Sequence, residues 1–309
     1  MRNAYMSTLY ELAKKNKQIM AIVADIGAIV FDKFKEDFPD QFVNVGVAEQ
    51  NLIGVAAGLA SCGKIPFTYT ITPFITMRPY EQIKNDVCLQ NTNVKIVGVG
   101  AGLCYSTLGP THHAIEDIAI MRVLPNMTIV SPADPLEAKK TTIAAAQLKG
   151  PVYLRIGTRG EPAIYQEDYN FKLGKGVELK DGADIAIFST GSITYDVLEA
   201  ARELEREKLS VKVINIHTIK PLDVKMILET AKATGSILTV EEHNIDGGFG
   251  SGIAEVLLES KIRDIKFKRL GIKDCFCSFY GTHKDLKAHF GLSKEDIKRE
   301  TRNLYKQKK

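Results

Sequence analysis

The amino-acid sequence predicts an α/β fold with two doubly wound domains and mainly parallel sheets, on three observations. Short apolar runs rich in β-branched residues recur along the chain, with helical patterns between them. These runs are continuously apolar instead of alternating, which is typical of strands covered by helices on both faces. The chain has 309 residues, of which 45% are hydrophobic and 25% charged, so it is long enough to build two cores.

The first domain is expected over residues 1–160. Its strands are predicted, in chain order, at 19–25 (IMAIVAD), 42–46 (FVNVG), 94–100 (VKIVGVG), 127–134 (MTIVSPAD) and 151–157 (PVYLRIG). Each run ends in a turn signal, as expected where a strand passes into a crossover connection. Because open parallel sheets bind ligands beyond the carboxyl ends of their strands, we expect a site in the loops after FVNVG, VKIVGVG and MTIVSPAD.

A linker is predicted at 161–182, because proline, glycine and charged residues interrupt the alternation there. The second domain is expected over 183–309, where the alternation of strand and helix patterns resumes. Its predicted strands are 183–191 (ADIAIFSTG), 211–219 (VKVINIHTI), 236–243 (SILTVEEH) and 266–272 (KFKRLGI).

Charge balance and cysteine content exclude several classes of function. The net charge of +4 is too small and too dispersed for a nucleic-acid or membrane surface. Five cysteines without Cys-x-x-Cys or Cys/His metal spacing predict no metal site in this chain and fit a reducing, cytoplasmic location. The N-terminal MRNAYMSTLYELA has no basic-then-apolar leader, and the apolar run 52–60 is too short to span a bilayer. We therefore expect no nucleic-acid or membrane partner.

One charged residue, Glu49, stands in the apolar stretch FVNVGVAEQNLIGVAAGLA (42–60). The spacing after it is helical, and Gly54 and Gly58, four residues apart, would let this helix pack closely on a neighbour. A carboxylate in a first helical turn is favoured by the helix dipole, so Glu49 can be interpreted as a cap. An isolated carboxylate in an apolar surround is costly without a partner, however, which is typical of a functional group. The residues alone leave both interpretations open.

The segment VNVGVAEQNLIGVAAGLA resembles the cofactor-glutamate segment of transketolases and related thiamine diphosphate enzymes. Glu49 matches the glutamate whose carboxylate bonds a ring nitrogen of the cofactor's aminopyrimidine. The stretch 69–87 (YTITPFITMRPYEQIKNDV) resembles the segment whose aromatic ring stacks on that ring, with Phe74 as the matching aromatic and Tyr80 as a further cofactor contact. Asp25, in VADIGA, falls at a family position near the cofactor. The resemblance thus implies thiamine diphosphate as cofactor, with Glu49 catalytic in its proton transfer.

The stretch 100–135 is similar to the family's active-site loop. His112 stands at the position of the substrate-contacting histidine, and His113 beside it is a second candidate for a general acid or base. In the second half, INIHTIKPLD and TVEEHNIDGGFGSGIAEVLLES resemble segments of the transketolase C-terminal domain. Five matching blocks in one order imply a thiamine diphosphate pyrimidine-binding domain followed by a transketolase C-terminal-like domain.

One part of the family pattern is missing. Family enzymes hold a divalent metal and the cofactor diphosphate on another, usually N-terminal, domain with a Gly-Asp-Gly motif and a downstream Asn. Here Asp-Gly occurs only in KDGAD and IDGGF, neither preceded by Gly, and Met1 falls at about the start of the family's pyrimidine-binding domain. We therefore expect the C-terminal subunit of a split transketolase. An N-terminal subunit would hold Mg²⁺ (or Ca²⁺), in a heterotetramer with two copies of each chain.

The positions that would contact a sugar are mixed. Arg2 matches a family arginine, and Arg155 and Arg159 lie near the position of another, so these three are the candidate substrate-binding residues. Family transketolases generally carry a histidine and an acidic residue where this sequence has Gly100 and Leu108. The resemblance therefore implies transfer of a two-carbon ketol unit with unusual sugar specificity, on a phosphorylated, nucleotide-linked or non-phosphorylated ketose.

Three alternatives stay open. The first is a half of a deoxyxylulose-phosphate synthase, because GPTHH and EEHNIDGGFG also resemble that family. The second is the beta subunit of a 2-oxo acid dehydrogenase, although GPTHHAIEDIAIMRVLPNM is more similar to transketolases. The third is a non-catalytic interaction module that has lost activity. Against that module stands the joint presence of Glu49, Phe74 and His112.

Overall fold

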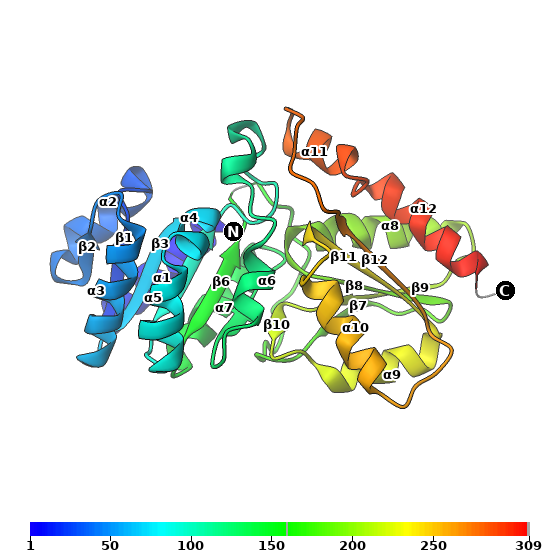
Figure 1. Cartoon of the computed structure of the whole chain (residues 1–309), viewed down its shortest axis with the longest axis horizontal. Helices are drawn as coiled ribbons and strands as arrows, with labels where there is room; N and C mark the ends of the chain where they lie inside the picture. Colours follow the sequence, from blue (N-terminus) through cyan, green and yellow to red (C-terminus); the bar gives the residue numbers. More distant parts are fainter. Residues whose placement is uncertain (159, 308–309) are drawn as a thin grey trace.

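The computed structural model describes residues 1–158 and 160–307 and contains two α/β domains side by side along its long axis (Figure 1). The first domain is built on a seven-stranded sheet in the order β10-β5-β6-β4-β3-β1-β2. Its strands are β1 (Ile19–Val23), β2 (Phe42–Asn44), β3 (Ile65–Ile71), β4 (Lys95–Val99), β5 (Thr128–Val130), β6 (Val152–Ile156) and β10 (Thr218–Lys220). All neighbours in this sheet are parallel except β10 and β5.

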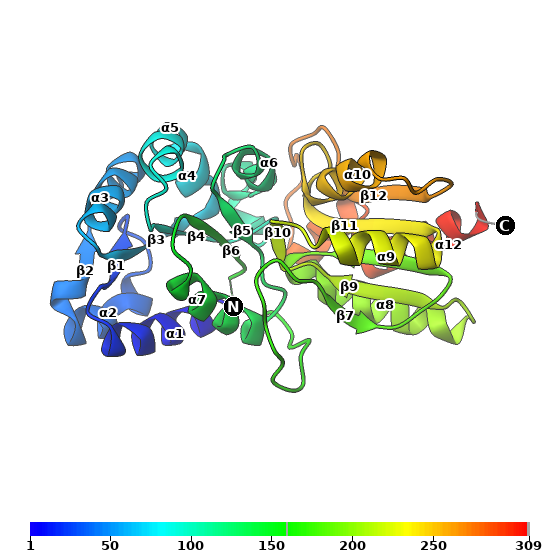
Figure 2. The same ribbon diagram turned by 90° about the horizontal axis from the view of Figure 1, so that it is seen from below.

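Helices cover both faces of the first sheet (Figure 2). One layer contains α1 (Arg2–Lys15), α2 (Ala28–Asp37) and α7 (Pro135–Gln147). The other contains α3 (Glu49–Ser61), α4 (Thr72–Met77), α5 (Tyr80–Gln82), the π-helix η2 (Ile83–Leu89) and α6 (Asp117–Arg122). The short turns η1 (Pro39–Gln41), η3 (Ser106–Leu108) and η4 (Pro110–His112) lie in loops. Strands β1, β4 and β6 are buried over their whole length, which explains their continuous apolar runs.

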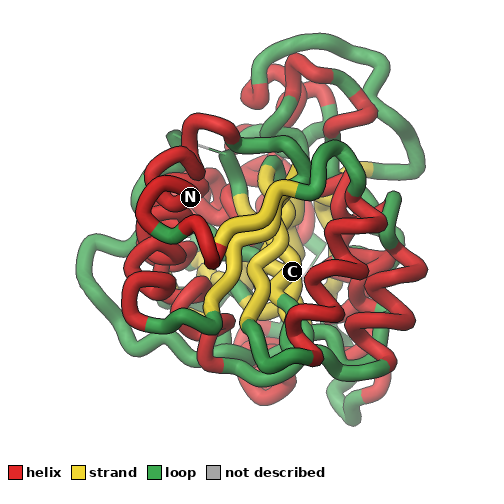
Figure 3. The backbone as a smooth tube through the Cα atoms, turned by 90° about the vertical axis from the view of Figure 1, so that its left-hand side faces the viewer, coloured by secondary structure: helices red, strands yellow, loops and turns green. Residues whose placement is uncertain are grey.

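The second domain has a five-stranded sheet in the order β12-β11-β8-β9-β7. Its strands are β7 (Val177–Lys180), β8 (Ile185–Ser189), β9 (Val211–Asn215), β11 (Ser236–Asn244) and β12 (Lys266–Ile272). Its helices are α8 (Thr194–Arg206), α9 (Val224–Thr234), α10 (Phe249–Glu259), α11 (His283–His289) and α12 (Lys294–Lys306), with a 3-10 turn η5 (Gly191–Ile193). Helices α8 and α12 pack together on one face of the sheet, and α9 and α10 on the other (Figure 1). Seen from the end of the first domain, the strands run between layers of helices (Figure 3).

The predicted fold class is confirmed, while three strands differ from the expectation. Strand β3 lies in the middle of the first sheet but was not predicted, because its buried threonines make IPFTYTI less apolar than its neighbours. Strand β10 follows β9 in the chain, yet it pairs antiparallel with β5 of the first sheet. Strand β7 lies within the segment 161–182, where only a linker was expected, and pairs antiparallel with β9.

The two domains share one buried apolar cluster. It includes Ile22 of β1 and Leu52 of α3 in the first domain, and Phe188 of β8 and Phe249 of α10 in the second. The chain segment before α11 also reaches the first domain, where Tyr280 lies against Gly109. Loops of the second domain therefore help to shape the carboxyl edge of the first sheet. Within the described residues, no helix has the length and apolar character needed to cross a membrane.

Candidate active site

Glu49 is the first residue of α3, and only 3% of its surface is exposed. Its carboxylate Oε2 accepts a hydrogen bond of 2.8 Å from Arg78 Nη1. The outward face of α3 carries Gly54 and Gly58, where an added Cβ would meet no atom of the described chain within 4 Å. The neighbour expected to pack on these glycines is therefore not a part of the described chain.

Phe74 lies in α4, four residues before Arg78, so both side chains point to one side of the helix end. The Arg78 guanidinium carbon lies 4.0 Å from the centroid of the Phe74 ring. A planar group with N–H donors is thus stacked on an aromatic ring while it donates to a buried carboxylate. Arg78 is nearly half exposed, at 46%, so its side chain can leave this place at little cost. The arrangement is one that an aminopyrimidine ring could take over.

His112 and His113 follow η3 in the loop after β4, and the structure gives them different environments. The His112 ring is partly exposed and lies 5.1 Å from the Phe74 ring, with its Nδ1 3.0 Å from Thr111 Oγ1. His113 is buried, with Nε2 3.3 Å from the Ser106 carbonyl oxygen. Burial lowers the pKa of His113, which favours a neutral ring. His112 therefore faces the Glu49–Phe74 region, while His113 holds the loop from inside.

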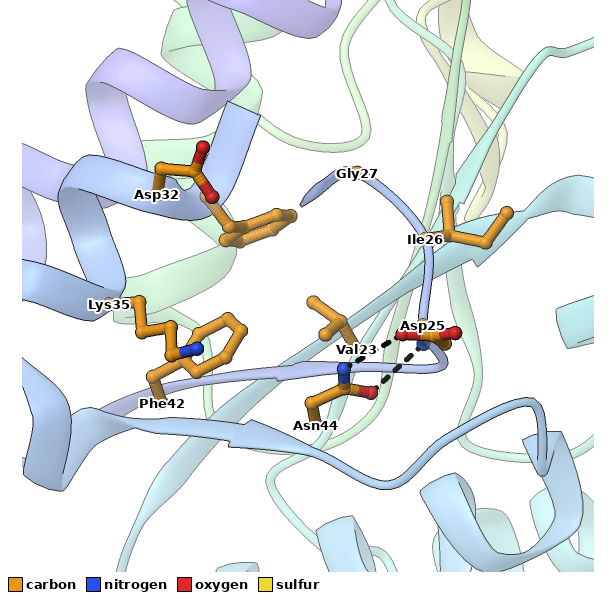
Figure 4. Close-up of a pocket in the computed structure, with 9 residues that line it drawn as sticks. Val23, Asp25, Ile26, Gly27, Asp32, Lys35, Phe42 and Asn44 are labelled. Atoms are coloured by element: carbon orange, nitrogen blue, oxygen red, sulfur yellow. Dashed lines mark hydrogen bonds between the residues drawn. The ribbon is translucent and has the colours of Figure 1, made fainter. Parts of the chain in front are cut away.

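Asp25 follows β1 and has a positive φ of 53°. Its backbone N–H donates to Asn44 Oδ1 at 3.0 Å, and Asn44 Nδ2 donates back to Asp25 Oδ1 at 3.1 Å. Figure 4 shows this pair at the edge of a small pocket of about 130 Å³, together with Gly27 and Lys35. The residues lining that pocket do not include Glu49, Phe74 or His112. Asp25 thus belongs to the same edge of the sheet but to a separate hollow.

Tyr80, the other expected cofactor contact, turns its hydroxyl toward α6. This hydroxyl donates to the Ile120 carbonyl oxygen at 2.8 Å, and the ring packs against the apolar cluster shared by the domains. Burial raises the pKa of the Tyr80 hydroxyl. The structure leaves only the ring of Tyr80 available to a ligand.

The three candidate substrate arginines have different positions. The Arg2 backbone N–H donates to the Thr158 carbonyl oxygen at 3.1 Å, which places α1 at the carboxyl end of β6, and its buried Nε has no partner among the described residues. Arg155 is 3% exposed, and its Nε donates to Asp117 Oδ2 at 2.7 Å. Because Arg155 is committed to this internal pair, we do not retain it as a substrate residue. Arg159 lies outside the described residues.

A buried polar network joins the two domains behind this edge of the sheet. Arg155 Nη2 donates to the backbone oxygens of Ala114 (2.9 Å) and Glu242 (3.0 Å), and Tyr153 donates to Asp117 Oδ2 at 2.6 Å. The Glu242 carboxylate accepts bonds from the Leu103 N–H, at 3.3 Å, and from Ser192 and His283. Strand β11 is therefore tied directly to the loop that carries His112.

Two features of the site were not predicted from the sequence. Arg78 could have been found, since it lies one helical turn after Phe74 in the segment 69–87. Tyr105 gave no signal, because its importance depends on tertiary contacts with Gly100 and His112. In the parts of the chain that the structure describes, no three His, Cys, Asp or Glu side chains gather as metal ligands.

Fold and site together define a two-domain α/β protein with a buried carboxylate, an aromatic ring and a histidine grouped near the carboxyl edge of one parallel sheet. Residues 1–160 match the transketolase pyrimidine-binding domain, and residues 174–297 match the transketolase C-terminal domain. The chain belongs to the transketolase family.

Similar proteins come from split and single-chain members. The chain is 38% identical to an apulose-4-phosphate transketolase subunit of Phocaeicola vulgatus, covering 96% of this chain and 94% of that protein. It is 37% identical to the 6-deoxy-6-sulfo-D-fructose transketolase subunit SqwH of Clostridium sp., over 100% and 95%. A solved structure described as a split gene transketolase, inactive beta4 tetramer, superposes with a TM-score of 0.92 at 39% identity, covering 100% of this chain and 99% of that chain.

A cofactor of this family, thiamine diphosphate, suits the residues present. The guanidinium of Arg78 already lies between the Phe74 ring and the Glu49 carboxylate, as a planar N–H donor. An aminopyrimidine needs the same two contacts, one stacking face and one carboxylate acceptor. The described part of this chain offers no comparable cluster for a metal-bound diphosphate.

Proposed function

We propose that this chain is the C-terminal subunit of a split, thiamine diphosphate-dependent transketolase. It would transfer a two-carbon ketol unit from a ketose to an aldehyde acceptor. The observation that carries the proposal is the placement of Phe74, Arg78 and Glu49, which provides a stacking face and a buried acceptor for one planar group. The names of the similar subunits support the same activity.

Glu49 would accept a hydrogen bond from the aminopyrimidine ring and so hold a proton at that atom. Its burial at the start of α3 keeps competing water away from the carboxylate. When bound, thiamine diphosphate supplies the nucleophilic carbon and the electron sink for breaking and forming the carbon–carbon bond. Phe74 would fix the plane of the ring, and Asp25 would lie beyond it at the same edge.

His112 would act on the substrate. With Nδ1 beside the Thr111 hydroxyl, its Nε2 is left to exchange a proton with a sugar oxygen near the Phe74 ring. His113 would keep the loop in place through its contact with the Ser106 carbonyl oxygen. We therefore assign the acid or base role to His112 alone, although the sequence made both histidines candidates.

A partner subunit would complete the site. Val47, just before Glu49, is 70% exposed and Met77, just before Arg78, is 42% exposed, so apolar side chains flank the buried carboxylate. Such surface is commonly covered by another protein. The partner would carry the Gly-Asp-Gly motif, Mg²⁺ (or Ca²⁺) and the diphosphate, and two copies of each chain would form a heterotetramer. Five free thiols suit a reducing cytoplasm.

The substrate we propose is a ketose with an anionic end and an unusual carbon skeleton. Arg2, with its unpaired buried Nε, is the residue of this chain suited to such an end. The similar subunits are named for apulose 4-phosphate and for a sulfonated fructose, which carry a phosphate and a sulfonate respectively.

The test is carboligation by a mixture of this chain with a Gly-Asp-Gly subunit from the same source, with thiamine diphosphate and Mg²⁺. A panel of phosphorylated, sulfonated and free ketoses is offered with aldehyde acceptors. Activity that requires both chains supports the proposal, and turnover by either chain alone contradicts it. Efficient use of xylulose 5-phosphate with ribose 5-phosphate would remove the unusual specificity but keep the transketolase.

A second activity has a specific observation behind it. The 1-deoxy-D-xylulose-5-phosphate synthase 1 of Geobacter sulfurreducens is 38% identical over 94% of this chain, which spans 46% of that protein. Pyruvate with glyceraldehyde 3-phosphate therefore belongs in the panel. Turnover of this pair in preference to every ketose would favour the synthase.

A further inference from the structure

Tyr105 lies directly against the backbone of Gly100, at the carboxyl end of β4. A Cβ added at Gly100 would lie 2.1 Å from Tyr105 Cε2 and 2.2 Å from Cδ2, far inside any contact that real side chains show. Gly100 also has a φ of +88°, which side chains rarely adopt. The absence of a side chain at Gly100 is therefore what allows the tyrosine ring to occupy this place.

On the side away from Gly100, the Tyr105 ring faces the candidate active site. Its ring lies 6.4 Å from the His112 ring, at an interplanar angle of 79°. His112 in turn lies 5.1 Å from the Phe74 ring. The three rings thus form a row in which Phe74 lies at the place assigned to the aminopyrimidine, His112 is in the middle and Tyr105 is farthest from that place.

Arg2 lies at the other end of this row. Burial raises the pKa of the Tyr105 hydroxyl, and the positive charge of Arg2 opposes that rise. The Arg2 charge acts in the same sense on the pKa of Tyr69, which burial also raises. The backbone agrees with this placement, because the Arg2 N–H donates to the Thr158 carbonyl oxygen at 3.1 Å and the Gly100 N–H donates to the Ile156 carbonyl oxygen at 2.9 Å, both at the end of β6.

Polar atoms in this corner lack partners. Among the residues that the structure describes, the buried Arg2 Nε has no hydrogen-bond partner and the Tyr105 hydroxyl makes no hydrogen bond. By contrast, the Tyr80 hydroxyl donates to the Ile120 carbonyl oxygen, and the Tyr153 hydroxyl donates to Asp117. Because protein interiors normally pair such groups, an unpaired donor and a partly exposed phenol at a strand end indicate a polar ligand.

We propose that the Tyr105 hydroxyl is a specificity-determining contact, which binds a hydroxyl group of the ketose chain between His112 and Arg2. A phenol can donate and accept, as a sugar hydroxyl can, and its rigid ring costs little conformational entropy on binding. This inference rests on the proposed function and adds to it that Tyr105 recognises a hydroxyl group of the ketose chain.

The test compares Tyr105→Phe with the parent chain in the assembled complex, using two donors. One is the ketose of the panel that the parent turns over best. The other is hydroxypyruvate, which carries the ketol unit but no sugar chain. For the ketose, kcat/KM falls about three- to tenfold, mainly through KM, because one neutral hydrogen bond is lost. For hydroxypyruvate, kcat/KM changes by less than about twofold, because no hydroxyl reaches Tyr105.

Two further variants sharpen the result. Gly100→Ala displaces the ring and lowers the ketose kcat/KM at least as much as Tyr105→Phe does. Tyr10→Phe removes a hydroxyl that bonds Asp37 on the surface of the same domain, and leaves both donors unchanged. An equal loss with both donors, or no loss with either, overturns the role of Tyr105 while the transketolase stands. Absence of turnover by the parent with every ketose and with hydroxypyruvate overturns both.

Discussion

The junction between the two domains and the candidate active site lie side by side, yet they treat polar groups in opposite ways. At the junction, Arg155 and Asp117 are almost fully buried, and the arginine bonds a carboxylate and two backbone oxygens. At the site, Arg2 has a buried Nε without a partner among the described residues, and His112 and Tyr105 are only partly covered. The polar groups around Arg155 are thus paired within the chain, whereas we propose that Arg2 and Tyr105 at the strand ends bind a ligand.

The largest effect is expected at Glu49, which tests whether a buried group of the site serves catalysis or stability. It is buried, yet its partner is a half-exposed arginine. The change Glu49→Gln keeps the shape of the side chain but removes the charge to which we assign the proton transfer. We expect kcat of the assembled complex to fall by about 10²- to 10⁴-fold, the range for losing a general acid or base. Steady-state carboligation kinetics measure it. A kcat within about threefold of the parent, with an unchanged unfolding temperature, would assign Glu49 to the helix cap alone.

At the junction, the corresponding change is Arg155→Met, which leaves Asp117 buried without its cation. Breaking one side of a buried pair typically costs about 3–5 kcal/mol, so we expect the free energy of unfolding of this chain to fall by that amount. Urea denaturation measures it. The matched control is Arg302→Met, which removes a surface pair with Glu207 and should cost about 1 kcal/mol or less. Equal losses for the two variants would contradict the structural role of Arg155.

His283 joins α11 to the junction, and its pair with Glu242 should make the stability of the chain depend on pH. The Glu242 carboxylate, 2.7 Å from its Nε2, raises the pKa of His283 above the usual 6.5, while burial opposes this. Burial alone would raise the pKa of Glu242, but His283, Lys287 and the Leu103 N–H together lower this pKa to about 2.

The sign of the pH effect follows from these two directions. A raised histidine pKa stabilises the fold fully below pH 6.5, and that stabilisation is lost as the pH rises through the raised value. A lowered glutamate pKa stabilises above pH 4.5 and is lost as the pH falls toward about 2. The pair is therefore strongest between pH 4.5 and 6.5.

We expect the stability difference between the parent chain and His283→Gln to shrink as the pH rises from about 6 to about 9. Thermal or urea unfolding across this range measures it. His289→Gln, on the exposed side of the same helix α11, is the control and should show no such trend. A difference for His283→Gln that grows with pH would reverse the assignment.

The smallest effect is expected at Arg78, which occupies the place we assign to the aminopyrimidine. Arg78→Ala removes a competitor for Glu49 and Phe74, so thiamine diphosphate should bind the complex about two- to fivefold more tightly, in line with an exposed cation–π contact of about 0.5–1 kcal/mol. Calorimetric titration measures it, with exposed Arg206→Ala of α8 as control. Weaker binding would make Arg78 a cofactor contact instead of a stand-in.

The sequence predicted what depends on local pattern. Continuous apolar runs predicted both sheets, and helical spacing placed Glu49 at a helix start, which the structure confirms. The separation of β10 from β9 could not be predicted, because the pairing of β10 with β5 is set by how the second domain packs on the first. The bond between Glu242 and the Leu103 N–H spans 139 positions, and Tyr105 depends on a glycine five residues away in a folded loop. Such contacts have no signature in one sequence.

The most direct test of the central claim is calorimetric titration of thiamine diphosphate with Mg²⁺ into this chain, into its Gly-Asp-Gly partner and into their complex. The account predicts tight binding to the complex only, because this chain supplies the carboxylate and the stacking ring while the partner supplies the diphosphate site. Equally tight binding to this chain alone, or no binding to a stable complex, would contradict it.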